Sequence, residues 1–144
     1  MAVYLTNELR QALVDAGQNP DDLADLFEAW KARPEDEFNS PFFGKDGAYD
    51  YPKVYGERPL RHVHLPPLAS KSAKERWRLD FLRRRMKRSN RALVYASRRN
   101  GDHLLIAVFD DPPGAHSTAR NEPALMKRLA GIADAFIQDG VVVV

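Results

Sequence analysis

Ala92-Leu-Val-Tyr-Ala-Ser-Arg-Arg-Asn-Gly-Asp-His-Leu-Leu-Ile-Ala-Val-Phe109 consists of two apolar runs that meet at Asn100-Gly101. Asn-Gly is the favoured pair of a type I′ turn, because both central residues of that turn need positive φ. The stretch therefore predicts a β-hairpin with a two-residue loop. That loop sets the opposite pairs as Arg99/Asp102, Arg98/His103, Ser97/Leu104, Tyr95/Ile106, Leu93/Val108, Val94/Ala107 and Ala92/Phe109. Both faces are apolar away from the turn, so we expect the hairpin in the middle of a sheet, with a layer on either side.

The rest of the chain supplies helices and short strands for those layers. Hydrophobic spacing and capping residues predict, in order, a short strand at 3–5, helices at about 8–16 and 20–33, a strand at 60–65, and a last helix at about 122–138. Residues 71–90 fit both helical and strand spacing, and we favour a helix. The fold class is thus α+β, a small twisted antiparallel sheet with packed helices.

The 144 residues suit one domain, which we divide into an N-terminal strand and helices (1–40), a central region (41–137) and a β-prone tail (138–144). The chain has no cysteine, which excludes disulfides, thiolate metal sites and a cysteine nucleophile. It shows neither a signal peptide nor a membrane span, so we expect a cytoplasmic protein without a membrane partner.

Charge is divided unevenly along the chain. Residues 1–50 carry 4 basic and 11 acidic side chains, whereas residues 71–99 carry 12 basic and 2 acidic ones. This asymmetry favours a polyanionic partner, RNA or DNA, at the basic segment, although a solvated charged face is the alternative. The residues that we expect to contact phosphates are Lys74, Arg78, Arg83, Arg84, Arg85, Lys87, Arg91 and Arg98.

A loop rich in Pro, Gly, Asp and aromatic residues spans 34–56. Its rings at Phe42, Phe43, Tyr49 and Tyr51 either stack on bases or pin the loop onto the core, and we favour the second interpretation.

Histidine is the side chain best suited to acid–base chemistry near neutral pH, and the chain has four. His62 and His64 lie two residues apart on the expected strand and share one face. They form either a functional pair or two half-buried rings bonded to backbone carbonyls; a metal pair is a third alternative, which no nearby cysteine or carboxylate completes. We expect His103, next to the hairpin turn, at the surface.

Six short segments, taken together and in order, resemble the YafO family of toxins over about residues 40–137. They are Phe43-Gly-Lys-Asp46 with Tyr49-Asp50; His62-Val-His-Leu65; Arg88-Ser-Asn90 before Leu93-Val-Tyr95; Leu104-Leu-Ile-Ala107; His116 with Ala119-Arg120; and Met126 ahead of Ala133-Asp-Ala-Phe136. The run Lys71–Arg88 is more basic than the family pattern, and the first forty residues match it only loosely.

The resemblance implies a toxin of a type II toxin–antitoxin system, a ribosome-dependent mRNA endonuclease with a RelE-like fold. Its implied partners are the ribosome, mRNA and a cognate antitoxin. Cleavage at a 2′-hydroxyl needs a base, an acid and cations, and no metal or small-molecule cofactor. The catalytic candidates are therefore His62, His64, His116, Arg88 and Arg120. The alternative is a non-catalytic protein of the same fold that inhibits translation by binding the ribosome or another nucleic-acid machine.

Overall fold

The computed structural model describes residues 1–142, apart from the side chains of 36–38. Its elements, in chain order, are β1 (Val3–Leu5), α1 (Asn7–Asp15), α2 (Pro20–Lys31), the 3-10 helix η1 (Pro34–Asn39), β2 (Asp46–Ala48), β3 (Arg61–His64), α3 (Lys71–Leu82), β4 (Ala92–Ser97), β5 (His103–Phe109), α4 (Ala115–Asn121) and α5 (Pro123–Asp139). None of the helices in this part of the chain is long and apolar enough to cross a bilayer.

The five strands form one sheet in the order β1-β5-β4-β3-β2. Neighbouring strands are antiparallel except for β1, which lies parallel to β5 with Tyr4 opposite Leu104. The expected purely antiparallel sheet is therefore wrong at this edge. Pairing of β1 depends on contacts about a hundred residues away in sequence, such as the hydrogen bond from the His103 amide to the Ala2 carbonyl (2.8 Å), and no local pattern specifies them.

The β4–β5 hairpin is present, but its turn differs from the expected type I′ turn. The Arg98 amide donates to the Asp102 carbonyl (2.8 Å) and the Gly101 amide to the Arg98 carbonyl (3.1 Å), which leaves three residues in the loop. Gly101 has a φ of 92° and Asn100 has no positive φ. This is a turn followed by a left-handed glycine, the next most common hairpin geometry.

The longer loop shifts the register near the turn. Pairing of Ala92 with Phe109, and of the next two pairs, is confirmed, but Tyr95 lies opposite Leu105 and Ser97 opposite His103. Ile106 is the additional residue of a β-bulge. The expected Tyr95/Ile106 pair is therefore wrong, and the two side chains belong to cores on opposite faces of the sheet.

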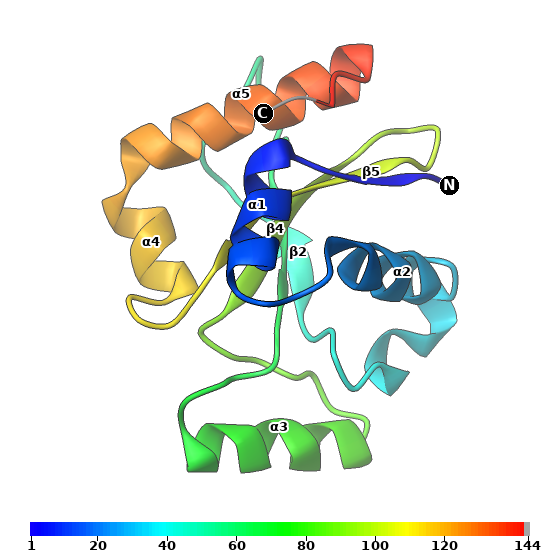
Figure 1. The fold of residues 1–144 in the computed structure, drawn as a ribbon, viewed down its shortest axis with the longest axis vertical. Coiled ribbons are helices and arrows are strands. Elements are labelled where there is room, and N and C mark those ends of the chain that lie inside the picture. Colours follow the sequence, from blue (N-terminus) through cyan, green and yellow to red (C-terminus); the bar gives the residue numbers. More distant parts are fainter. Residues whose placement is uncertain (143–144) are drawn as a thin grey trace.

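Two helical layers cover the sheet, which confirms the expected layer on either side of the hairpin. The strand β4 is the middle strand of the five. On one face, α1 and α2 pack on a core that includes Phe27, Leu93 and Tyr95. On the other face, α4 and α5 pack on a core that includes Val94 and Phe136. Figure 1 shows α3 apart from both layers, at the end of the molecule opposite α5.

The segment 71–90 is helical only over α3, so the expected helix is confirmed to Leu82 and is wrong beyond it. Trp77 is the buried residue of α3, and its indole nitrogen donates to the Pro41 carbonyl (2.8 Å). Arg84 has a φ of 53°, which ends the helix. Residues 83–90 then run back to β4. Of the tail, residues 141 and 142 form no strand, and residues 143–144 lie outside the described residues.

Asp46 holds β2 in place on the α2 side of the sheet. Its carboxylate accepts from the Tyr95 hydroxyl (2.5 Å), the Lys31 ammonium (3.1 Å) and the Arg61 guanidinium (3.2 Å). These bonds connect β2 to α2, β3 and β4. They fix β2, which Tyr49 directly follows, and β3, which carries His62.

Candidate functional site

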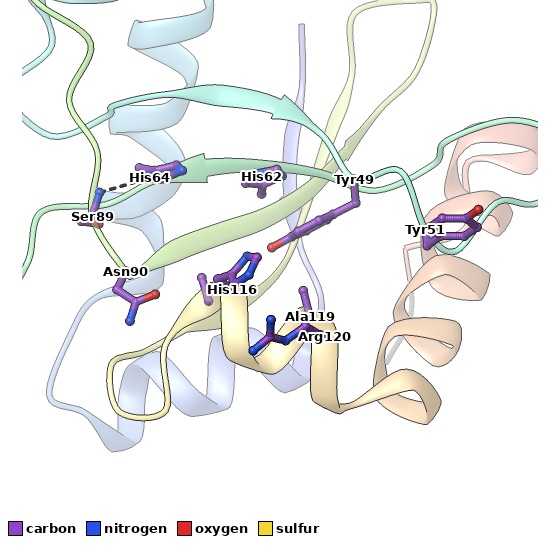
Figure 2. A pocket seen from close by; sticks show the side chains of 10 residues that line it. Tyr49, Tyr51, His62, His64, Ser89, Asn90, His116, Ala119 and Arg120 are labelled. Carbon is purple, nitrogen blue, oxygen red and sulfur yellow. Dashed lines mark hydrogen bonds between the residues drawn. The ribbon is translucent and has the colours of Figure 1, made fainter.

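A cleft of about 370 Å³ opens between β3, α4, the loop after β2 and the segment that leads into β4. Figure 2 shows the residues that line it. They are Tyr49, Tyr51, His62, His64, Ser89, Asn90, Ala115, His116, Ala119 and Arg120. Four of the five catalytic candidates from the sequence thus lie in one cleft. His62 and His64 come from β3, and His116 and Arg120 come from α4, much later in the chain.

The strand β3 places His62 and His64 side by side, as the period-two pattern predicts, with ring centroids 6.0 Å apart. Tyr49 stacks on the His62 ring, with centroids 4.0 Å apart and an interplanar angle of 21°. Among the described residues, the buried Tyr49 hydroxyl and the buried Nδ1 of His62 have no hydrogen-bond partner. Buried polar atoms without partners are rare and costly, and they occur at functional sites. In Figure 2 the hydroxyl end of Tyr49 is directed toward the His116 side of the cleft.

Burial keeps both strand histidines neutral at pH 7. It lowers the pKa of His62 to about 4, with a smaller contribution from the neighbouring His64. Burial, with the positive charges of Lys45 and Arg88, also lowers the pKa of His64. The Tyr49 pKa is raised by burial, so this hydroxyl keeps its proton. The cleft therefore presents neutral imidazoles beside a neutral phenol.

Ser89 fixes the tautomer of His64. Its backbone N–H donates to Nδ1 of His64 (2.9 Å), so the neutral ring carries its proton on Nε2. The Ser89 hydroxyl donates to the Leu65 carbonyl and accepts from the Arg91 amide (3.1 Å). His64 is therefore a hydrogen-bond donor held against the segment that leads into β4.

The helix α4 is docked on Asn90. The Asn90 carbonyl accepts from the Ala115 amide (2.8 Å). A β-carbon on Gly114 would lie 2.2 Å from the Asn90 side chain, and the φ of Gly114 is 102°, so glycine is required there. One turn apart on α4, His116 and Arg120 are exposed at the cleft mouth.

The remaining basic candidates are dispersed. Arg88 is exposed and close enough to His64 to lower its pKa, whereas Arg98 lies beside α5 and donates to the Ile137 carbonyl (3.3 Å). Arg91 pairs with Asp110 (2.8 Å). Apart from Lys87, the other basic candidates are exposed on and after α3: Lys74, Arg78, Arg83, Arg84 and Arg85, of which Arg78 pairs with Glu75 (2.6 Å).

Two polar residues that we expected at the surface are buried. Lys87 is fully buried, and its ammonium lies 6.0 Å from the centre of the Trp77 ring. His103 is buried against Phe27 and bonds to the Ser97 hydroxyl (2.7 Å). His103 is covered by α2, which is distant in sequence, and Lys87 is covered by the nearby α3.

Six cleft residues were absent from the catalytic and phosphate-binding sets taken from the sequence: the polar Tyr49, Tyr51, Ser89 and Asn90, and the apolar Ala115 and Ala119. Two signals pointed to the polar ones: Tyr49, Ser89 and Asn90 fall in segments that resemble the family, and Tyr49 and Tyr51 belong to the aromatic loop. Among the side chains that the structure describes, no group of three or more His, Asp or Glu residues is arranged to hold a metal ion.

Gly44 packs closely against the segment that precedes Arg88. A β-carbon there would lie 2.3 Å from the Lys87 carbonyl oxygen and 2.8 Å from the Trp77 ring. We expect Gly44→Ala to lower the free energy of unfolding by about 1–3 kcal/mol, because the backbone before Arg88 must shift. Urea unfolding measures the change. Gly47→Ala is the matched control, since nothing lies within 4 Å of its β-carbon and the backbone tolerates a side chain; equal stability of the two variants would contradict this packing.

The two histidines with a pKa of about 4, His62 and His103, make stability depend on pH. In the unfolded chain both titrate near 6.5. Between those values the unfolded chain binds more protons, so the free energy of unfolding falls as the pH falls from about 6.5 to 4. We expect each histidine to lower the free energy of unfolding by about 1–3 kcal/mol over this pH range, after allowance for its partial exposure. Urea unfolding across this range should show a shallower pH slope for His103→Gln than for the parent; parallel slopes would contradict the assignment.

Comparison with protein-family models decides the family. The model of the YafO toxin of type II toxin–antitoxin systems matches residues 28–138. The chain belongs to the YafO toxin family. Its partner is accordingly a cognate antitoxin, and the matched range contains every residue that lines the cleft. The YafO model leaves out β1, α1 and the first turns of α2. No curated protein and no solved structure matches the chain, so the RelE-like fold stays an expectation.

Proposed function

We propose that this YafO-family toxin is an endoribonuclease that cleaves mRNA on the ribosome and so inhibits translation in the cytoplasm. The observation that carries the proposal is the cleft, in which His62, His64, His116 and Arg120 meet beside a buried tyrosine. Acids, bases and cations within one cleft are what cleavage at a 2′-hydroxyl requires.

In the proposed reaction, neutral His62 is the base. Its ring takes the proton of the ribose 2′-hydroxyl, and the 2′-oxygen forms a bond to the adjacent phosphorus. The bond from phosphorus to the 5′-oxygen breaks, and His116 supplies the proton to that oxygen. The products are a 2′,3′-cyclic phosphate and a 5′-hydroxyl end. The low pKa of His62 keeps its lone pair available at pH 7.

Charge that develops on the phosphate oxygens needs donors. His64 offers its Nε2–H, because Ser89 occupies its Nδ1. Arg120 contributes from the cleft mouth and Arg88 from beside His64. The Tyr49 hydroxyl, which stays protonated, is an additional donor. In this role these groups bind the transition state more tightly than the substrate.

The exposed basic residues that come before Arg88 in the chain would bind the RNA backbone. Lys74 and Arg83–Arg85 lie on and after α3, and the chain leads from them directly to Arg88. Their contacts would be to phosphates of mRNA or ribosomal RNA, so binding should weaken steeply with salt. An acidic segment of the antitoxin that folds on binding would suit the same surface.

The test is to induce the chain in cells without its antitoxin and to map mRNA 5′ ends by primer extension. The proposal predicts new ends that require translation and are absent in a His64→Ala, His116→Ala double variant. Arg10→Ala, on the exposed side of α1, is the control and should cleave normally. Growth arrest without new ends would replace the nuclease with a ribosome-binding inhibitor, and absence of arrest would contradict both.

A further inference from the structure

Two tyrosines in the loop 49–58 expose their rings to solvent. Tyr51, which lines the cleft, is 77% exposed and Tyr55 is 97% exposed. The other aromatic residues of the segment 42–49 pack inward: Phe43 is buried and Tyr49 stacks on His62. The loop 49–58 thus contains one tyrosine ring that packs within the protein and two that contribute little to its packing.

Tyr55 is held in an unfavourable backbone conformation. Val54 and Glu57 exchange two backbone hydrogen bonds (3.0 and 2.9 Å) around it. Tyr55 has a φ of 50° and Gly56 a φ of 78°, so the turn is of the type in which both central residues have positive φ. Asn is the favoured first residue of such a turn, and a bulky side chain there is strained. Strain at an exposed ring without packing benefit indicates a function for that ring.

The loop is tied to the rest of the protein at its base and carries a positive charge next to Tyr51. Arg58 pairs with Asp50 across its base (3.2 Å), and Val54 packs against the core on the α5 side. The Lys53 ammonium lies 5.9 Å from the centre of the Tyr51 ring. A rigid aromatic surface with an adjacent cation matches a nucleobase together with its phosphate.

We propose that Tyr51 and Tyr55 are a stacking platform for the nucleobases of single-stranded RNA next to the cleaved phosphate. The inference rests on the proposed function, since it takes the histidine cleft as the reaction site. In the view of Figure 2, His64, His62, Tyr49 and Tyr51 follow one another in a row, so a strand in the cleft reaches Tyr51, and Tyr55 lies four residues further along the same loop. Stacking on aromatic rings is the usual way in which proteins hold unpaired bases and tolerates different sequences.

Exposed tyrosines also suit protein partners, the antitoxin included. Two observations favour RNA: Tyr51 lines the same cleft as the histidines, and Lys53 lies beside the Tyr51 ring. The experiment separates the two classes of partner.

The test measures binding of a short fluorescein-labelled RNA oligonucleotide by fluorescence anisotropy at low salt. Its riboses carry 2′-O-methyl groups, which remove the attacking hydroxyl and prevent cleavage. We expect Tyr55→Asn and Tyr51→Ala each to weaken binding about tenfold. Tyr55→Asn should keep or raise the melting temperature, because Asn-Gly suits the turn. Tyr55→Phe, which keeps the ring, and Leu26→Asn, on the opposite face of the sheet, should bind as the parent does.

Parent-like binding by Tyr55→Asn, or no binding of the oligonucleotide by the parent, would overturn the proposal. Loss of antitoxin binding with unchanged RNA binding would overturn it in favour of a protein contact. Cleavage of unmodified mRNA on ribosomes is measured separately. A parent that binds through its tyrosines and cleaves nothing would refute the proposed function while supporting the platform.

Discussion

Replacement of His62 by alanine is expected to slow RNA cleavage by about 10²- to 10⁴-fold, the range in which general bases contribute. His62 combines a buried ring, a pKa lowered to about 4 and a position between Tyr49 and His64. The rate is measured with purified chain and translating ribosomes, as mRNA cleaved per unit time.

The fold should survive this change. Nδ1 of His62 makes no hydrogen bond to the described residues, so alanine leaves no partner atom unpaired there. Circular dichroism and urea unfolding check this. His64→Ala differs, because it removes the acceptor of the Ser89 amide and should lose both rate and stability. A folded His62→Ala variant that cleaves at the parent rate would remove His62 from the reaction.

Replacement of Phe27 by alanine is expected to lower the free energy of unfolding by about 3–5 kcal/mol. Phe27 is 0% exposed, and its ring meets Trp30, Phe43 and Tyr95 edge to face, with centroids 5.6, 5.8 and 4.9 Å away. It joins α2 to the segment before β2 and to the central strand. The midpoint of urea unfolding measures the loss.

Leu26→Ala provides the comparison for Phe27. The two residues are adjacent on α2, but Leu26 is 47% exposed, and its removal should change stability by about 0.5 kcal/mol or less. Similar losses in the two variants would contradict the packing of α2 on the sheet.

Local rules account for the parts of the site that the sequence predicted. Alternation along residues 60–65 placed His62 and His64 on one face, and the pair lies on β3 in that way. The first helix begins by a local rule as well, because the Thr6 hydroxyl accepts from the Leu9 amide (3.1 Å). His116 and Arg120 came from the family resemblance, since α4 itself was not expected.

The expectations that failed depend on tertiary packing and on the geometry of a turn, neither of which the residue type specifies. His103 follows a turn and is polar, yet α2 covers it with Phe27. Lys87 belongs to a basic run, yet it is buried near Trp77 of α3. The Asn-Gly pair at the hairpin suits both a two-residue type I′ turn and a three-residue loop that ends in a left-handed glycine. The protein has the three-residue loop, together with a β-bulge at Ile106. Neither burial nor register was available from residue type alone.

The chemistry of the RNA ends tests the central claim most directly. Purified chain, freed of antitoxin, is mixed with ribosomes that translate a defined mRNA, and the ends of the fragments are determined. Attack by the 2′-oxygen predicts a 2′,3′-cyclic phosphate and a 5′-hydroxyl, formed by the parent and absent in the His64→Ala, His116→Ala variant. Intact mRNA on inhibited ribosomes would contradict the account, as would fragments with 5′-phosphate and 3′-hydroxyl ends.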